Sequence, residues 1–158
     1  MTADKLTHLD DEGHAHMVDV TEKAVTVRKA TATARVLLSP ESLALLREGA
    51  LPKGDALAVA RVAGIMAAKR THELIPLCHP VAIHGVELDL RLTSQSVDIT
   101  ATVRTADRTG VEMEALTAAS ISALTLIDMV KGVDRSAFVQ DVKVMSKEGG
   151  RSGTWTRA

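Results

Sequence analysis

Residues 109–133 read TGVEMEALTAASISALTLIDMVKGV and have the composition of one long helix. Apolar side chains recur near helical spacing along the stretch. Thr109 followed by Glu112 predicts a capping box at the first turn, and Gly132 stands where helices commonly end. We expect the rest of the chain to pack around this helix.

Charged residues lie at both ends of the expected helix. Glu112-Met113-Glu114 stands at its start, and Asp128 and Lys131 stand at its end, three residues apart and so neighbours on one face. Glu114 and Asp128 are separated by fourteen residues, about 21 Å at a rise of ~1.5 Å per residue. Either the substrate is long, or a neighbouring chain supplies the second end of the site. The simpler alternative is a helix cap at one end and a solvated ion pair at the other.

Alternating apolar and polar residues predict strands with one buried face on both sides of a helical region. The alternation covers residues 24–38 and a hairpin of residues 86–92 and 97–103, and a less regular last strand follows at 138–145. In between, Ser39-Pro40 begins a short helix that ends at Gly49. Asp55 caps a second helix, rich in small side chains, that runs to about Arg70.

The predicted order of elements gives the fold class α+β. It matches a ferredoxin-like βαββαβ topology, with a four-stranded antiparallel sheet and helices on one face. We expect a single domain over residues 1–158, with residues 1–16 and 148–158 flexible. The second face of the sheet is either solvated or covered by another subunit. Its four uncharged polar side chains favour the subunit: Thr31, Thr33, Thr100 and Thr102.

The composition excludes several classes of function. A net charge of -1 gives no field for nucleic acid, and one Trp, one Phe and no Tyr leave little aromatic surface for stacking on bases. The single cysteine, Cys78, excludes an internal disulfide and suits a reducing compartment. The polar N-terminus does not resemble a signal peptide, and no apolar run approaches the ~18 residues of a membrane span. We therefore expect a cytoplasmic protein without nucleic-acid or membrane partners.

Two further features point to a binding site. Lys53 precedes a helix N-terminus, where a cation is mildly unfavourable, so a functional role is favoured. Residues 74–80, LIPLCHP, place an apolar run ending in Cys78-His79 between two prolines. This is either a rigid linker or a rigid binding loop that presents His79. The absence of a second cysteine disfavours zinc, and we expect no metal site.

Six stretches of the chain together resemble the molybdenum cofactor biosynthesis protein C family, the cyclic pyranopterin monophosphate synthases. The resemblance rests on HMVDV at 16–20, KGD at 53–55, AAKRT at 67–71, LIPLCHP at 74–80, GVEMEALTA at 110–118 and DMVK at 128–131. They span nearly the whole chain, and the two longest are specific. The chain departs from the family at Arg151, where lysine is common, and at His72, where relatives often carry an aromatic residue.

The resemblance implies a lyase that converts 3′,8-cyclo-7,8-dihydroguanosine 5′-triphosphate to cyclic pyranopterin monophosphate and diphosphate. It implies a homohexamer built as a trimer of dimers, with sites at the dimer interface. No cofactor is required, although Mg²⁺ can accompany the triphosphate. By family match Asp128 is catalytic, with Lys131 and Lys53 as acid and base partners. The same match implies a substrate-binding set of Leu77, Cys78, His79, Glu112, Met113, Glu114, Lys69, Arg28 and Lys147.

A second hypothesis is a non-catalytic ferredoxin-like module for small-molecule binding or assembly. Glu112, Asp128 and the lysines would then form ion pairs between subunits. Mass spectrometry of the product after incubation with the cyclic nucleotide separates the two hypotheses. For the enzyme, we expect Lys53 of one chain and Asp128 of another to share a site.

Overall fold

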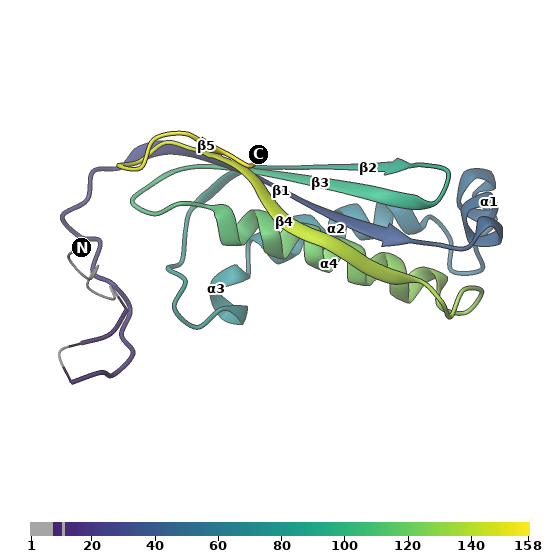
Figure 1. The fold of residues 1–158 in the computed structure, drawn as a ribbon, viewed down its shortest axis with the longest axis horizontal. Coiled ribbons are helices and arrows are strands. Elements are labelled where there is room, and N and C mark those ends of the chain that lie inside the picture. The colour runs from purple at the N-terminus through teal and green to yellow at the C-terminus, as the bar shows by residue number, and fades with distance from the viewer. Residues whose placement is uncertain (1–7, 11) are drawn as a thin grey trace.

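The computed structural model describes residues 8–10 and 12–158, and its strands form one antiparallel sheet with helices packed on it. Figure 1 shows α2 and α4 running side by side along the sheet, with α1 beyond one end. The strand order is β2-β3-β1-β4-β5. The elements are β1 (Thr26–Leu37), α1 (Pro40–Glu48), α2 (Ala56–Ala68), α3 (Thr71–Leu74), β2 (Ile83–Leu92), β3 (Ser96–Asp107), α4 (Glu112–Val130), β4 (Phe138–Glu148) and β5 (Trp155–Thr156).

The core lies between the sheet and the two long helices. Period-two alternation in β1 and β3 puts every second side chain on the helix side of the sheet. The buried hydrophobic residues of these strands are Ala30, Ala32, Ala34, Val36, Val97, Ile99, Ala101 and Val103. The alternation therefore predicted the buried face of both strands correctly.

Small side chains let α2 approach α4 closely. A Cβ added at Gly64 would lie 2.8 Å from the Ala118 carbonyl oxygen and would collide with Ser122 Oγ. Ser122 Oγ also donates a hydrogen bond to the Ala60 carbonyl at 2.9 Å. This contact fixes the position of α4 relative to α2 and the sheet.

The helix caps agree with the sequence in α1 and α2 and differ in α4. Ser39 accepts from the Ser42 amide, and Asp55 accepts from the Ala58 amide, as expected. The predicted capping box at Thr109 is wrong. Helix α4 begins at Glu112, and its N-cap residue, Val111, makes no side-chain hydrogen bond to the first turn. The Glu112 carboxylate instead lies against Gly110 and pairs with a distant lysine.

The sheet has five strands rather than the expected four. Trp155 and Thr156 pair with Lys147 and Ser146 of β4 and so add a short edge strand. This pairing falls in the segment 148–158, whose flexibility stays a prediction. Residues 1–7 and 11 of the segment 1–16 lie outside the described residues.

Helix α4 is long and apolar enough to cross a bilayer, judged by length and composition alone, within the part of the chain that the structure describes. The expectation that no segment approaches such a length is therefore wrong. However, 56% of the apolar window is buried inside the protein. This burial is that of a core helix, and α4 carries Glu114 and Asp128 near its two ends.

Candidate active site

The first cluster of candidate residues joins the end of α4 to the turn before α2. Lys53 Nζ donates to the Asp128 carboxylate at 2.8 Å and to the Asp128 main-chain carbonyl at 2.7 Å. Lys131 Nζ lies 2.7 Å from the other carboxylate oxygen. The i,i+3 spacing on α4 brings Lys131 to Asp128, and the approach of the α1–α2 turn brings Lys53. One carboxylate is thus held between two ammonium groups.

Ion pairing governs the charge of this cluster. Hydrogen bonds from Lys131 and then Lys53 lower the pKa of Asp128 to about 2. Asp128 is therefore ionised throughout the physiological range. The three side chains remain accessible to a ligand, since about half of the Asp128 side chain is exposed.

The second cluster surrounds a cavity of about 300 Å³ at the start of α4. The 74–80 loop forms one wall and the first turn of α4 forms the other. The lining residues are Cys78, His79, Val81, Thr109, Gly110, Glu112, Met113 and Glu114. Five of the residues expected to bind substrate therefore lie around one cavity: Cys78, His79, Glu112, Met113 and Glu114.

Burial distinguishes Glu114 from the other carboxylates of the site. The residue is 4% exposed, and desolvation, aided by the neighbouring Glu112, raises its pKa to about 7. Burial also raises the pKa of the Cys78 thiol, and the Glu114 charge adds to that effect. The cavity therefore contains a carboxyl group that can be protonated near neutral pH and a cysteine that stays a thiol there.

The 74–80 loop is tied to the N-terminal segment. A His79 ring nitrogen, Nε2, lies 2.7 Å from the Val18 carbonyl oxygen. This bond fixes the imidazole at the mouth of the cavity. Leu77 is on the same loop, is 38% exposed and does not line the cavity.

Three predicted cations remain, and two of them, Lys147 and Arg28, have contacts near the start of α4. Lys147 Nζ is 3.3 Å from a Glu112 carboxylate oxygen, and both side chains are about one-third exposed. Lys69 is the exposed C-cap residue of α2, two residues before α3. Arg28 donates from Nε to the Asp107 carbonyl at 2.9 Å and from Nη2 to the Arg108 carbonyl at 3.0 Å.

The two clusters lie at opposite ends of α4, which runs from Glu112 to Val130. One chain therefore does not bring Asp128 and Glu114 together. The expectation that Lys53 and Asp128 come from different chains is wrong, because these two side chains bond within one chain. The pairing depends on where the α1–α2 turn packs, which the local sequence does not encode.

Some residues around the cavity were not among the predicted site residues. Val81, Thr109 and Gly110 line it, and Asp107 braces it by accepting from the Ala82 amide at 3.2 Å. Thr109 and Gly110 adjoin the Glu112-Met113-Glu114 motif, and this proximity in the sequence could have indicated that they line the cavity. Asp107 gives no signal in the sequence, because its partners lie in other segments.

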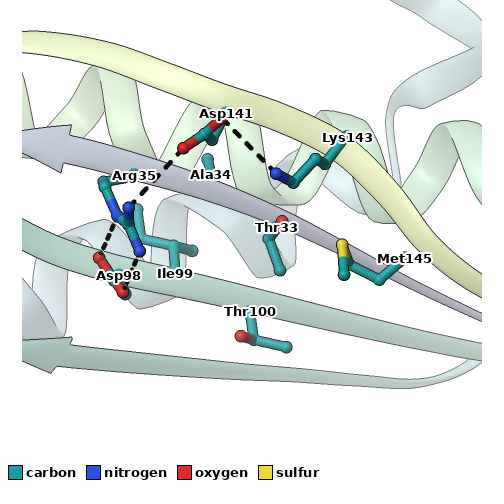
Figure 2. A pocket seen from close by; sticks show the side chains of 9 residues that line it. All are labelled: Thr33, Ala34, Arg35, Asp98, Ile99, Thr100, Asp141, Lys143 and Met145. Carbon is teal, nitrogen blue, oxygen red and sulfur yellow. Dashed lines mark hydrogen bonds and ion pairs between the residues drawn. The ribbon is translucent and has the colours of Figure 1, made fainter. Parts of the chain in front are cut away.

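A separate hollow of about 240 Å³ lies on the sheet face away from the helices (Figure 2). The charged side chains that line this hollow form ion pairs with one another. Arg35 makes two 2.8 Å hydrogen bonds to Asp98, and Asp141 lies between Arg35 at 3.7 Å and Lys143 at 3.5 Å. None of the predicted site residues lines this hollow, so it is not the candidate active site.

Fold and site together define an α+β protein with two groups of acid, base and cationic side chains suited to an anionic small molecule. Residues 17–150 match the model of the MoaC family. The chain is 61% identical over 155 residues to the cyclic pyranopterin monophosphate synthase of Streptomyces coelicolor, covering 98% of this chain and 91% of that one. It is 60% identical to cyclic pyranopterin monophosphate synthase 2 of Mycobacterium tuberculosis (97% and 92% covered). It is 59% identical to the synthase of Thermomicrobium roseum (97% and 93% covered).

The chain belongs to the MoaC family, because the family match covers most of its length and the relatives are aligned almost from end to end.

Proposed function

We propose that this protein binds 3′,8-cyclo-7,8-dihydroguanosine 5′-triphosphate between the Asp128 cluster of one chain and the Glu114 cluster of its partner, and converts it to cyclic pyranopterin monophosphate and diphosphate. The chain is a cyclic pyranopterin monophosphate synthase, a lyase of molybdenum cofactor biosynthesis, by its family and its relatives at about 60% identity. The non-catalytic alternative has no comparable support. The observation that carries the proposed chemistry is the Asp128 carboxylate held between two lysines.

The reaction moves protons at several atoms as one ring opens and another closes, which requires positioned acids and bases. Asp128, with its pKa near 2, stays ionised and orients the ammonium groups of Lys53 and Lys131. These lysines are then the acid and base partners. Glu114, with its pKa near 7, can take up or release a proton at neutral pH at the other end of the substrate.

Cations must also stabilise the diphosphate as it leaves. Lys147 and Lys69 would serve the triphosphate, since Lys147 pairs with Glu112 at the start of α4 and Lys69 is exposed at the end of α2. The 77–79 loop with Met113 would hold the ring system, because Cys78, His79 and Met113 face one cavity. The reaction is a rearrangement that expels diphosphate, so it requires no resident cofactor. Mg²⁺ bound to the triphosphate is compatible with it.

The site is assembled from two chains in this proposal. Fourteen residues of helix, about 21 Å, separate Glu114 from Asp128 within one chain. A symmetric dimer in which two α4 helices approach in antiparallel directions would place one chain's Glu114 end beside its partner's Asp128 end. We extend the proposal to a homohexamer formed as a trimer of dimers, in the cytoplasm. The finer fold class is ferredoxin-like, supported by the β4-β1-β3-β2 order of the four long strands.

The test is product formation by the wild type and Asp128→Asn, measured by mass spectrometry after incubation with the cyclic triphosphate. Asp128→Asn is nearly isosteric and removes only charge, so the folded variant should lose turnover. Wild-type rates from folded Asp128→Asn would remove Asp128 from the mechanism. Activity retained after chelation of divalent ions would support the absence of a required metal.

A further inference from the structure

The turn that joins β4 to β5 lies directly over Arg28. Gly149 and Gly150 both have positive φ, at 92° and 70°. A Cβ added at Gly150 would collide with Arg28 Nη1 and would lie 2.9 Å from Cζ. Glycine at position 150 therefore leaves the space that the guanidinium occupies.

Two other sides of the same guanidinium are held by main-chain atoms. Nε and Nη2 donate to the carbonyl groups of Asp107 and Arg108, at 2.9 and 3.0 Å. Those two residues immediately precede Thr109 and Gly110, which line the cavity. Arg28 thus fixes the segment that leads into the first turn of α4, where Glu112 stands.

The contacts continue from that segment to the facing wall and to Lys147. The Asp107 carboxylate accepts from the Ala82 amide at 3.2 Å, next to Val81 of the cavity wall. Lys147, which pairs with Glu112, lies two residues before the glycine turn on the same strand. Arg28 therefore contacts the segment that leads to Glu112, and the glycine turn that covers Arg28 follows Lys147 in the chain.

We propose that Arg28 is a positioning residue, covered by Gly150, that sets the Glu112–Lys147 side of the cavity. It does so by holding residues 107–108, and it does not bind the triphosphate. The inference rests on the proposed function, in which Glu112 and Lys147 bind substrate. It differs from the resemblance, which implies that Arg28 itself belongs to the substrate-binding set.

The first test compares Gly150→Ala with Gly153→Ala in the full-length protein. Gly153 lies in the same turn and also has positive φ, at 63°, but a Cβ there meets nothing within 4 Å. The control therefore carries the backbone strain without the collision. We expect Gly150→Ala to lower kcat/KM on the order of 100-fold, as expected for a misplacement of about 1 Å, and to speed amide hydrogen exchange in residues 107–114. Gly153→Ala should stay within about twofold of wild type.

The second test asks whether the effect passes through Arg28. In an Arg28→Ala background the colliding atoms are gone, so adding Gly150→Ala should change kcat/KM by no more than Gly153→Ala does. Arg28→Lys keeps the charge but cannot reach both carbonyls, and should also speed exchange in 107–114.

Two results would overturn the inference. If Arg28→Lys and Arg28→Ala raise KM alone and leave exchange in 107–114 unchanged, Arg28 contacts the substrate directly. If Gly150→Ala speeds exchange while kcat/KM is unchanged, the contact exists but the Glu112 side has no part in the reaction. The second result would contradict the substrate-binding roles of Glu112 and Lys147 in the proposed function, whereas the first would contradict only the role of Arg28.

Discussion

At the residue scale, the Asp128 carboxylate makes two short contacts, one with Lys53 and one with Lys131. Each lysine is either a proton-transfer group or a clamp for phosphate. A clamp contributes to substrate affinity, whereas a proton-transfer group contributes to turnover once substrate is bound. These roles can be separated because both side chains are exposed and neither supports the core.

We predict that Lys53→Ala and Lys131→Ala each abolish product formation even at saturating substrate and leave the oligomer intact. The reason is that each removes one of the two groups that Asp128 orients. The measurement is initial rate against substrate concentration, with size-exclusion chromatography as the check on assembly. A raised KM with full saturated turnover would instead identify that lysine as a phosphate clamp.

Glu114 gives a prediction about pH. Its pKa in the folded chain, about 7, exceeds the ordinary value of 4.5, so between these values the folded state retains a proton that the unfolded state has released. Stability therefore falls as pH rises through that window, by up to ~1.4 kcal/mol per pH unit. Glu114→Gln cannot ionise, so its free energy of unfolding relative to wild type should rise from pH 4.5 to 7 and then level off.

The measurement is chemical denaturation of both proteins across that range. Glu41→Gln is the control variant, because it makes the same substitution at an exposed position in the first turn of α1. A stability difference for Glu114→Gln that does not vary with pH would show that Glu114 is already ionised throughout.

At the element scale, the packing of α2 against α4 depends on one missing side chain. Gly64→Ala would usually favour a helix by about 1 kcal/mol. Here its Cβ would lie 2.8 Å from a backbone oxygen of α4 and 2.6 Å from Leu88 Cδ1. We predict a net loss of about 1–3 kcal/mol, as for other overpacked cores.

Denaturant melts of Gly64→Ala and Gly132→Ala provide the comparison. Gly132 follows α4 in open space, so the same chemical change meets nothing within 4 Å there. Equal stability of the two variants would mean that α2 moves aside at little cost.

The elements also show which parts of the fold the sequence can predict. Strand alternation and the caps at Ser39 and Asp55 depend on neighbours within a few residues, and these predictions agree with the structure. The prediction of a capping box at the start of α4 was wrong, because Glu112 pairs with Lys147, thirty-five residues further along the chain. The edge strand β5 was missed because its two residues gain a strand only by pairing with β4.

The same division applies to the site. Asp128 and Lys131 are three residues apart on a helix, so their pairing follows from the sequence alone. Lys53 reaches Asp128 from seventy-five residues away, and only the packing of the α1–α2 turn creates that contact. Arg28 was predicted to bind substrate, and its hydrogen bonds to the carbonyls of Asp107 and Arg108 join segments 79 and 80 residues apart in the chain.

At the scale of the whole molecule, the separation of the two clusters predicts complementation between variants. Asp128→Asn and Glu112→Gln damage opposite ends of α4. If sites are shared between chains, a mixed dimer has one site with both defects and one with neither. Unfolding the two variants together and refolding them should restore about a quarter of wild-type turnover by random pairing.

The control for this experiment is the pair Asp128→Asn and Lys53→Ala, which lie in one cluster of one chain. That mixture should regain nothing. Native mass spectrometry would establish that mixed dimers form in both cases. If mixed dimers of Asp128→Asn and Glu112→Gln form but recover no turnover, the two ends of α4 do not share a site across the dimer interface.

The short strand β5 gives the protein an optical property. Trp155 is the only tryptophan, and the chain has no tyrosine. The residue is 42% exposed, its ring lies beneath the Arg157 guanidinium, and its backbone pairs with Lys147. Intrinsic fluorescence therefore comes from a single chromophore beside the Glu112–Lys147 pair. Substrate that engages Lys147 should change the intensity or emission maximum of this one indole, so that binding can be titrated without a label, and Trp155→Phe should abolish the signal while product is still formed.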